Sequence, residues 1–555
     1  MTTGLHLDPA NDPATALLVI APPGCGKTEL LAHRAVRLLG TLEPHQKILA
    51  LTFSNRATRN LRERLQGALG PQRFRRHVTV TNFHGHAAGI IRAHGRTIGV
   101  DPNSPLPQRA TLATAVSAFT DGLPIGPALK RKAEIEAALS EAKRQALDDA
   151  QVREALVRSG SSFALQIEED RQARGILHYD DLLRHAQRLL RIKAVARLYQ
   201  QHYGAVLVDE FQDLSLQQLE IALASCTANR TFVGDPLQGI YAWAGARPVQ
   251  VEQQLRTLCG APKQLTVSYR SSPAVLEVVN HVAAALNGEP LRAADPAAWR
   301  RGGAAAASVF ASGQQEADWI VGTASKIMDM DPAATIGIIT RSAWRRRPID
   351  AAFANAMHLP RQRWDLAIED TETVQRIVAA VRRLPRKADM VAVHQAVLQE
   401  VDPSNAELLE QTMAALQEFE SLVEQTGTPS AAVAQLREPD GEGAIEQGVH
   451  LLNAHTGKGQ QFDWVFVPGL EEFHIPDNHA ETADQLDEEL RVLLVMLSRA
   501  RHGVVITRAH SLISKAGNPY STAPSRWWGL ASALCPLDGE EIRDHLTQAE
   551  EPPAP

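Results

Sequence analysis

The chain has 555 residues, which at roughly 150 residues per domain corresponds to three or four compact units and excludes a single small fold. Its 57 Lys and Arg residues against 63 Asp and Glu residues give a net charge of -6, so any nucleic-acid site must be a local groove and not a uniformly basic surface. Hydrophobic residues make up 44% of the chain, which is enough to bury globular cores and argues against disorder along most of it.

Cysteine usage and the chain ends indicate the compartment. The four cysteines are isolated, so neither a disulfide framework nor a C-x-x-C metal-ligand pair can be drawn. The first fifteen residues lack a basic stretch followed by an apolar one, and no window approaches 18 uninterrupted apolar residues. We therefore expect a cytoplasmic protein that is neither exported nor membrane-spanning. The Pro-rich and Ala-rich close of the chain predicts a flexible tail over 536–555.

Short apolar runs rich in β-branched residues recur along the chain, and each is followed by a turn and a helical pattern. This order is typical of parallel strands joined by crossover helices, and nine or ten such strands need two sheets. The run GGAAAA at 302–307 lacks the pattern and is expected to be a loop. The predicted strands lie at 16–20, 47–53, 77–83, 204–210, 230–235, 264–269, 335–341, 462–469 and 503–508.

A phosphate-binding loop is predicted directly after the first strand. The segment 21–28 reads APPGCGKT and precedes an amphipathic helix, so backbone N–H groups and the helix N-terminus can cradle phosphates. Lys27 would reach the β- and γ-phosphates, and the Thr28 hydroxyl would bind Mg²⁺, although Ala21 stands where the full consensus has Gly. The alternative is a glycine-rich turn that only caps a helix. The residues expected around the nucleotide phosphates are Pro23, Gly24, Cys25, Gly26, Lys27 and Thr28.

Two adjacent carboxylates follow a second apolar strand. The run 205–208 ends in Asp209 and Glu210, so a buried strand delivers both groups to the carboxyl edge of a sheet, where such sheets bind ligands. Asp209 is placed for Mg²⁺ and Glu210 for the attacking water. Taken alone, the pair could also be an acidic helix N-terminus, because carboxylates favour that end of the helix dipole.

Further segments of the chain carry a resemblance to a known family. These are LTFSNRATRNLRERL (51–65), TNFHGHA (81–87), LVDEFQDLSLQQ (207–218), VGDPLQGIYAWAGA (233–246), SYRSSPAVL (268–276), LLNAHTGKGQQFDWVFV (451–467), LDEELRVLLVMLSRAR (486–501) and PSRWW (524–528). In this order, and together with the phosphate loop, they resemble the motifs of the UvrD/Rep/PcrA family of superfamily 1 DNA helicases over most of residues 14–530.

The resemblance implies an α/β fold with two RecA-like, parallel-sheet motor domains and two mainly helical insertions. The predicted tail, 536–555, lies outside these four units. The first motor domain is expected at 1–95 and 184–260, a helical insertion at 96–183, the second motor domain at 261–350 and 446–535, and a reduced helical insertion at 351–445.

The resemblance also implies roles at the nucleotide. Gln238 would sense the γ-phosphate, and Arg270 and Arg499 would act as arginine fingers from the second sheet, although each arginine alone reads as an ordinary surface ion pair. Tyr269 would stack on adenine and Gly459 would line the nucleotide site. The family's glutamine motif, which reads adenine, has no clear counterpart here, so base selectivity is left open.

Aromatic and imidazole groups at strand-to-loop junctions would stack on bases of a single strand without reading sequence. For Phe53 and Phe83, packing in the core is the alternative. The residues expected to contact DNA are Phe53, Asn55, Phe83, His84, Tyr241, Trp243 and His455.

The expected activity is that of an ATP- and Mg²⁺-dependent motor that moves 3'-5' along single-stranded DNA and acts at single/double-strand junctions in repair or defence. The short second insertion motivates a first rival, a DNA-stimulated regulatory ATPase that activates a separate nuclease partner in an anti-phage complex. A second rival is a DNA-binding scaffold whose ATPase has decayed, against which the intact Lys27, Asp209 and Glu210 argue.

Overall fold

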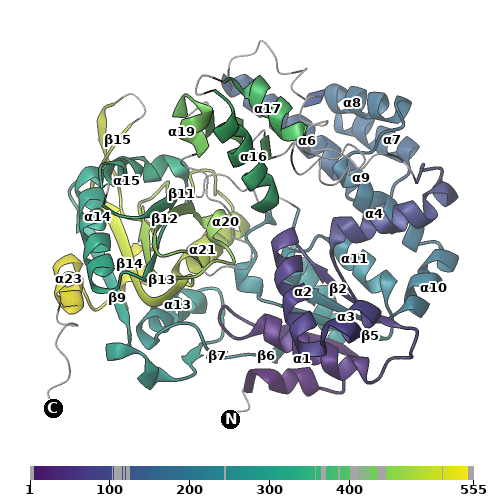
Figure 1. Ribbon diagram of the computed structural model, residues 1–555, viewed down its shortest axis with the longest axis horizontal. Helices are drawn as coiled ribbons and strands as arrows, with labels where there is room; N and C mark the ends of the chain where they lie inside the picture. Colours follow the sequence, from purple (N-terminus) through teal and green to yellow (C-terminus); the bar gives the residue numbers. More distant parts are fainter. Residues whose placement is uncertain are drawn as a thin grey trace.

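The structure is a computed structural model, and its two sheet-based units lie side by side with helices above them (Figure 1). Of the helices it describes, none combines the length and apolar character needed to cross a bilayer. The residues described are 5–102, 104, 115–116, 119, 125–242, 245–356, 358–363, 371–385, 388–399, 412, 415–416, 419–420, 422–423, 426–433, 445–514 and 517–547.

The first sheet has six parallel strands and is covered by helices on both faces. Because both faces are buried, its strands are almost continuously apolar. Alternate residues serve opposite faces: Ile48 and Ala50 pack in the core on one face, whereas Leu49 and Leu51 pack in the core on the other. In spatial order the strands are β3 Val78–Asn82, β2 Lys47–Thr52, β4 Tyr203–Asp209, β5 Asn229–Gly234, β1 Ala16–Ile20 and β6 Lys263–Gln264.

Several α-helices of this unit follow the carboxyl end of a strand, as crossover connections require. The α-helices are α1 Lys27–Leu39, α2 Asn55–Leu69, α3 Pro71–His77, α4 Phe83–His94, α9 Tyr179–Leu190, α10 Lys193–His202, α11 Leu216–Ser225 and α12 Pro248–Cys259, and the short 3₁₀ helices are η1 Leu5–Asn11, η2 Gly95–Ile98, η3 Phe211–Asp213 and η4 Pro236–Gln238.

The predicted strand 264–269 is divided in two. Its first part, β6, pairs with β1, so the first sheet extends past residue 260, where we expected that domain to end. Its second part, β7 Val267–Ser268, pairs with β8 Arg292–Ala293 in a separate two-stranded sheet. The chain therefore leaves the first sheet at 264 and begins its next helix, α13 Pro273–Ala284, nine residues later.

The second sheet also has six parallel strands. Helices α13 and α21 Ala483–Leu497 pack on one face, and α14 Gly313–Met330 and α15 Ala343–Asn355 pack on the other. In spatial order the strands are β11 Arg361–Arg363, β12 Gly448–Asn453, β10 Thr335–Thr340, β13 Phe462–Pro468, β14 Ala500–Ala509 and β9 Ala304–Phe310.

Two expectations about this unit were wrong. The alanine run expected to be a loop forms the edge strand β9, because its small side chains pack under helices on both faces of the sheet. Part of the expected flexible tail forms α23 Gly539–Thr547, since Ile542 and Leu546 lie on one side of the helix and are buried against the second sheet's unit. Residues 548–555 of the predicted tail lie outside the described residues.

Helical segments interrupt both sheet units and lie above them in Figure 1. The first consists of α6 Ile125–Lys143, α7 Asp149–Ser159 and α8 Ser162–Ala173, which share a core around Ile135 and Leu156. The second contains α16 Thr371–Arg383, α17 Met390–Leu398 and α19 Pro429–Val433, with a core of its own that includes Phe419. Much of the predicted insertion 351–445 lies outside the described residues.

A buried ion cluster joins the first helical segment to α9. Lys143 Nζ lies 2.8 Å from a Glu168 oxygen and 3.0 Å from an Asp181 oxygen. Arg171 Nη2 lies 2.6 Å from Glu168, and Arg184 Nη2 lies 2.7 Å from Asp181. All five side chains are almost completely shielded from solvent, so the charges are neutralised by one another.

Candidate nucleotide site and DNA-binding face

The predicted phosphate loop follows β1 and ends in the first turn of α1. Gly24 has a φ of +81° and Gly26 a φ of +85°, which are conformations that favour glycine. A Cβ atom on Gly24 would lie 2.6 Å from Arg270 Cβ, so only glycine fits there. Pro23 and Cys25 complete the turn, and burial raises the pKa of the Cys25 thiol to about 12. Lys27 and Thr28 begin the helix, where free N–H groups favour an anion.

The two predicted carboxylates stand at the carboxyl end of β4, beside this loop. Asp209 ends the strand, and Glu210 adopts a left-handed backbone conformation with φ 55°. Lys27 Nζ donates a 2.8 Å hydrogen bond to Glu210 Oε2, and Gln212 Nε2 donates one of 2.7 Å to the same oxygen. The lysine expected to grip phosphates is thus paired with the expected general base.

The charges of this site are poorly matched. Burial, together with the Glu210 charge, raises the pKa of Asp209 to about 7. Although burial opposes it, Lys27 and Lys458 lower the pKa of Glu210 to about 2. Burial also raises the pKa of Asp235, at the end of the neighbouring strand β5. Glu210 therefore remains ionised, whereas Asp209 is a buried carboxylate that lacks a full counter-charge.

The donor set fits a nucleotide with a divalent cation. The Thr28 hydroxyl and the Asp209 carboxylate are hard oxygen donors of the kind that Mg²⁺ prefers, and a cation there would stabilise the ionised form of Asp209. The loop between Pro23 and Lys27 offers backbone N–H groups for phosphate oxygens. Residues on this chain can therefore hold both groups.

The segment between the sheets brings Tyr269 and Arg270 to the loop. Tyr269 N donates a 2.9 Å hydrogen bond to Gly24 O, and the residue is 48% exposed. The Arg270 Nη1 atom is buried without a hydrogen-bond partner, and burial lowers the pKa of this arginine. Such an unsatisfied donor is costly unless an acceptor such as a phosphate oxygen binds there.

A direct contact between the sheets is made by the other predicted arginine finger. Arg499 Nη2 donates a 3.3 Å hydrogen bond to Gln238 Oε1, and Gln238 Nε2 donates one of 2.9 Å to Asp235. Burial and the nearby Arg270 lower the pKa of Arg499 to about 9. Arg499 Nη1 also donates to Gln460 O, beside Gly459, whose φ is +81°. The predicted γ-phosphate residues from both sheets thus lie together.

Lys458 makes a second contact between the two sheet units, across the nucleotide site that is called the cleft below. Lys458 Nζ lies 2.6 Å and 2.7 Å from the two carboxylate oxygens of Asp213 and 2.7 Å from Gln238 O. Burial raises the pKa of Asp213 to about 6 in spite of this lysine. Asp235 was missed from the sequence, although it directly follows β5, the neighbour of the strand that ends in Asp209, a placement that could have identified it.

The loop after η4 belongs to the first sheet's unit but contacts the second sheet's unit. Ile240 is fully buried in the second sheet's core. Glu488 Oε1 accepts a hydrogen bond of 3.2 Å from Ala242 N, and Arg491 Nε donates one of 3.0 Å to Gly239 O, both from α21. Displacement of α21 would therefore move this loop.

Three of the predicted DNA-contacting side chains form one group of rings. Phe53 stacks on Tyr241 with ring centroids 5.3 Å apart, and Tyr241 lies 6.1 Å from His455. Lys458 Nζ lies 4.7 Å above the Tyr241 ring. Burial, aided by Arg341, lowers the pKa of His455 to about 4, so its imidazole is neutral at pH 7. Phe53, Tyr241 and His455 are called the ring group below.

The other predicted DNA contacts divide. Phe83 was assigned wrongly, because its side chain is fully buried in the first sheet's core and no base can reach it. His84 is half-buried and stacks on Tyr179, with ring centroids 4.0 Å apart. Asn55 is the first residue of α2, and its side chain lies outside the described part, as does the whole of Trp243.

Comparison with known proteins agrees with the two-sheet arrangement. Residues 5–257 match the model of the UvrD/REP helicase N-terminal domain, and residues 396–511 match that of the UvrD-like helicase C-terminal domain. The first match covers the phosphate loop, both carboxylates and the ring-bearing loop, and the second covers His455 and Arg499.

Curated relatives match along nearly the whole chain. The ATP-dependent DNA helicase PcrA of Staphylococcus aureus strain Mu50 is 24% identical over 647 residues, covering 92% of this chain and 83% of its own. The ATP-dependent DNA helicase UvrD2 of Mycobacterium bovis is 26% identical over 578 residues, covering 93% and 79%. With two family models matched in order and relatives aligned over more than nine-tenths of this chain, the chain belongs to the UvrD/REP family of superfamily 1 helicases.

Proposed function

We propose that the chain is an ATP- and Mg²⁺-dependent DNA helicase that moves 3'-5' along single-stranded DNA and opens single/double-strand junctions in repair or defence. Its relatives are named ATP-dependent DNA helicases, which supports ATP as the reactant and DNA as the polymer along which the protein moves. The observation that carries the proposal is the loop from Gln238 to Tyr241, which joins the Gln238 contact with Arg499 to the ring group within four residues.

In the reaction each polar group has a separate task. Lys27 leaves Glu210 and grips the β- and γ-phosphates, which frees the Glu210 carboxylate to accept a proton from the attacking water. Thr28 and Asp209 would hold Mg²⁺, which would supply charge neutralisation at the phosphates. Arg270 and Arg499 donate to the charge that develops in the transition state, an effect worth about 10³–10⁵-fold in rate for an arginine finger.

Coupling to DNA follows from the same contacts. When Arg499 turns to the phosphate it releases Gln238, and α21, which ends beside Arg499, holds the loop through Glu488 and Arg491. Tyr241 moves with that loop against Phe53 and His455. ATP binding and base stacking are thus linked, as two sites that bias one structural element must be.

The decisive experiment measures ATP turnover with and without single-stranded DNA for Tyr241→Ala and Tyr241→Phe. Loss of the ring should weaken DNA binding by about 1–3 kcal/mol, roughly 5- to 150-fold, and remove much of the stimulation, whereas the phenylalanine variant keeps a ring and should behave as wild type. Basal turnover should be unchanged in both. Equal DNA stimulation in Tyr241→Ala would exclude the ring group as the DNA contact.

Polarity requires a separate measurement. Strand displacement on duplexes with a 3' or a 5' single-stranded overhang distinguishes the two directions, and we expect activity with the 3' overhang. Opening DNA costs about 1.4 kcal/mol per base-pair step, and this free energy must come from the binding and hydrolysis of ATP. Displacement from the 5' overhang alone would overturn the proposed direction.

One observation favours a second candidate function. The alignment with the Staphylococcus aureus PcrA runs over 647 positions, although this chain has 555 residues, so that relative has segments that this chain lacks. A motor reduced in this way could serve as a DNA-stimulated regulatory ATPase that activates a separate nuclease. DNA-stimulated ATP turnover without displacement of either overhang would favour this candidate.

A further inference from the structure

An arginine-rich flank lies on the first sheet's unit outside the nucleotide site and the ring group. Residues 55–77, which span α2 and α3, contain seven arginines and one glutamate, whereas the whole chain has more acidic than basic residues. Arg62, Arg73, Arg75 and Arg76 are exposed, and Arg59 is half-buried. These five arginines are called the basic flank below.

The periodicity of α2 explains why the flank faces outward. Leu61, Leu65 and Leu69 recur every four residues and are buried in the first sheet's core. Arg59 and Arg62 lie to one side of that apolar stripe, and Arg62 Nη2 donates a 3.1 Å hydrogen bond to Val80 O. Val80 belongs to β3, the edge strand of the sheet, so the flank follows an open sheet edge.

Charge pairing sets the basic flank apart from other exposed arginines. Arg174 lies 3.0 Å from Asp170, Arg191 lies 2.7 Å from Glu220, and Arg256 lies 2.6 Å from Glu252. Within the described residues, none of the five flank arginines forms an ion pair with a carboxylate. Clustered like charges repel one another, so the flank is a local positive field that a polyanion would neutralise.

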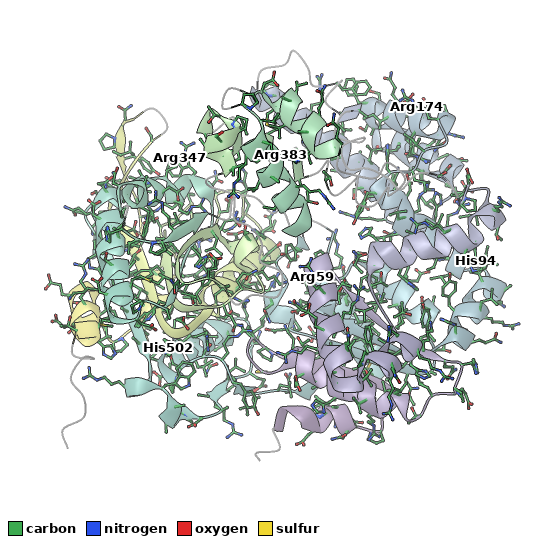
Figure 2. All side chains as sticks on the ribbon, in the orientation of Figure 1. Arg59, His94, Arg174, Arg347, Arg383 and His502 are labelled. Atoms are coloured by element: carbon green, nitrogen blue, oxygen red, sulfur yellow. The ribbon has the colours of Figure 1, made fainter. Side chains whose placement is uncertain are left out.

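The position of the flank relative to the ring group identifies the polyanion. Phe53 comes two residues before the first residue of α2, and that helix, at 1.5 Å per residue, carries the flank away from the rings for roughly 22 Å. Figure 2 shows Arg59 on α2 near the middle of the view, whereas Arg174 lies at the outer side of the first helical segment. A strand that leaves the rings can therefore run directly onto the arginines.

We propose that the basic flank binds the phosphate backbone of single-stranded DNA beyond the nucleotides that stack on the ring group. This inference rests on the proposed function, because it extends the same DNA track. Phe74, the phenyl ring between Arg73 and Arg75, is half-buried and packs against the first sheet's core, so the contact is with phosphates and not with bases. It lengthens the footprint and makes binding more sensitive to salt.

The test compares two triple variants with equal changes in charge. Arg73→Gln, Arg75→Gln and Arg76→Gln remove three flank arginines that make no side-chain hydrogen bond within the described residues, so folding should be unaffected. The control, Arg174→Gln, Arg191→Gln and Arg256→Gln, removes three exposed arginines elsewhere. Binding of oligo(dT) of about 8 and about 30 nucleotides is measured by fluorescence anisotropy over a range of salt concentrations.

For the long oligonucleotide, the slope of log K against log salt concentration should become shallower by about 0.7 for each arginine removed, roughly 2 in all. Near 0.1 M salt this corresponds to a loss of affinity of up to about 100-fold. Both variants should bind the short oligonucleotide with the wild-type affinity. The control variant should keep the wild-type salt dependence of binding at both lengths.

An unchanged slope for the long oligonucleotide would overturn the inference, and so would an equal loss at both lengths. A slope change with duplex DNA alone would assign the flank to a duplex instead. If the wild-type protein binds neither oligonucleotide, the proposed function itself fails. This outcome is distinct from a failure of the inference alone, in which the wild-type protein binds DNA and the flank variant binds equally well.

Discussion

Two buried groups of charges in this molecule are built on opposite plans. In the first helical segment, Lys143, Arg171 and Arg184 face Glu168 and Asp181 at 2.6–3.0 Å. Although burial opposes it, Lys143 and its neighbours hold the pKa values of both acids below their usual range. In the nucleotide cleft the pKa values of Asp209 and Asp213 are raised to about 7 and about 6, and the pKa of Arg499 is lowered to about 9.

The difference separates a finished structural element from one that awaits a ligand. When the pKa of an acidic side chain is lowered, the folded state stabilises its charge. When the pKa of an acidic side chain is raised, or that of a basic side chain is lowered, the folded state disfavours the charge. The cleft therefore carries an electrostatic cost that phosphates and a cation would relieve, as unpartnered Arg270 Nη1 also indicates.

The largest expected effect breaks the cleft's chemistry without breaking its fold. Glu210→Gln removes the carboxylate that would accept the water's proton, so ATP turnover should fall by about 10²–10⁴-fold. ATP binding should survive, because Lys27 and the loop amides remain, whereas Lys27→Ala should weaken binding itself. Single-turnover hydrolysis and nucleotide-binding titrations measure both, and near-normal turnover in Glu210→Gln would remove this residue from the mechanism.

Breaking the finished cluster should affect stability instead. Lys143→Met leaves Glu168 and Asp181 short of a cation in a dry site, which should cost about 3–5 kcal/mol in local stability. Asp149→Asn is the matched control, because its carboxylate pairs with Arg184 but is 43% exposed, and it should cost about 1 kcal/mol or less. Hydrogen exchange of α6 to α9 reports both, and equal effects would contradict the distinction.

Ligand addition should sharpen the comparison. A non-hydrolysable ATP analogue with Mg²⁺ at 100 times its dissociation constant should stabilise the folded cleft by about 2.7 kcal/mol. Protection against hydrogen exchange should appear in the phosphate loop and near Arg499. Exchange in α6 to α8 should be unchanged, and protection spread evenly over both regions would argue against a cleft that awaits its ligand.

The smallest expected effect is a gain in stability. Asp209→Asn removes a buried charge without a full counter-charge, so the nucleotide-free protein should be more stable by about 1–3 kcal/mol at pH 8. The same change should weaken Mg²⁺-dependent ATP binding, which separates the gain from a general improvement in packing. Denaturant unfolding without nucleotide measures it, and a loss of stability would show that Asp209 is already satisfied.

Local patterns were enough to predict the two sheets and the phosphate loop. Strand, loop and helix follow one another within a few residues there, so spacing alone fixes the placement of Lys27, and Asp209 is the last residue of its strand. The cross-cleft contacts could not be predicted from such patterns. Lys458 meets Asp213, and Arg499 meets Gln238, across more than two hundred residues of chain, and only the docking of the two sheets brings them together.

Phe53 and Phe83 show why identical patterns can differ in outcome. Both follow a strand of the first sheet, but Phe53 precedes its helix by two residues and remains half-exposed beside Tyr241. Phe83 is itself the first residue of α4, and the packing of α4 against α9 turns its ring into the core. Sequence patterns locate the start of a helix only to within about one or two residues, which is too coarse to decide which way one ring faces.

The short segment from 268 to 272 is bonded to both sides of the cleft. Tyr269 N donates to Gly24 O in the phosphate loop, whereas Ser271 Oγ donates to Ala500 O and Ser272 N to Arg501 O in the second sheet's unit. Rotation of one sheet unit against the other must therefore be absorbed within a few backbone bonds next to Gly24. Because Gly24 belongs to the phosphate loop, such a rotation would change the geometry of the nucleotide site directly.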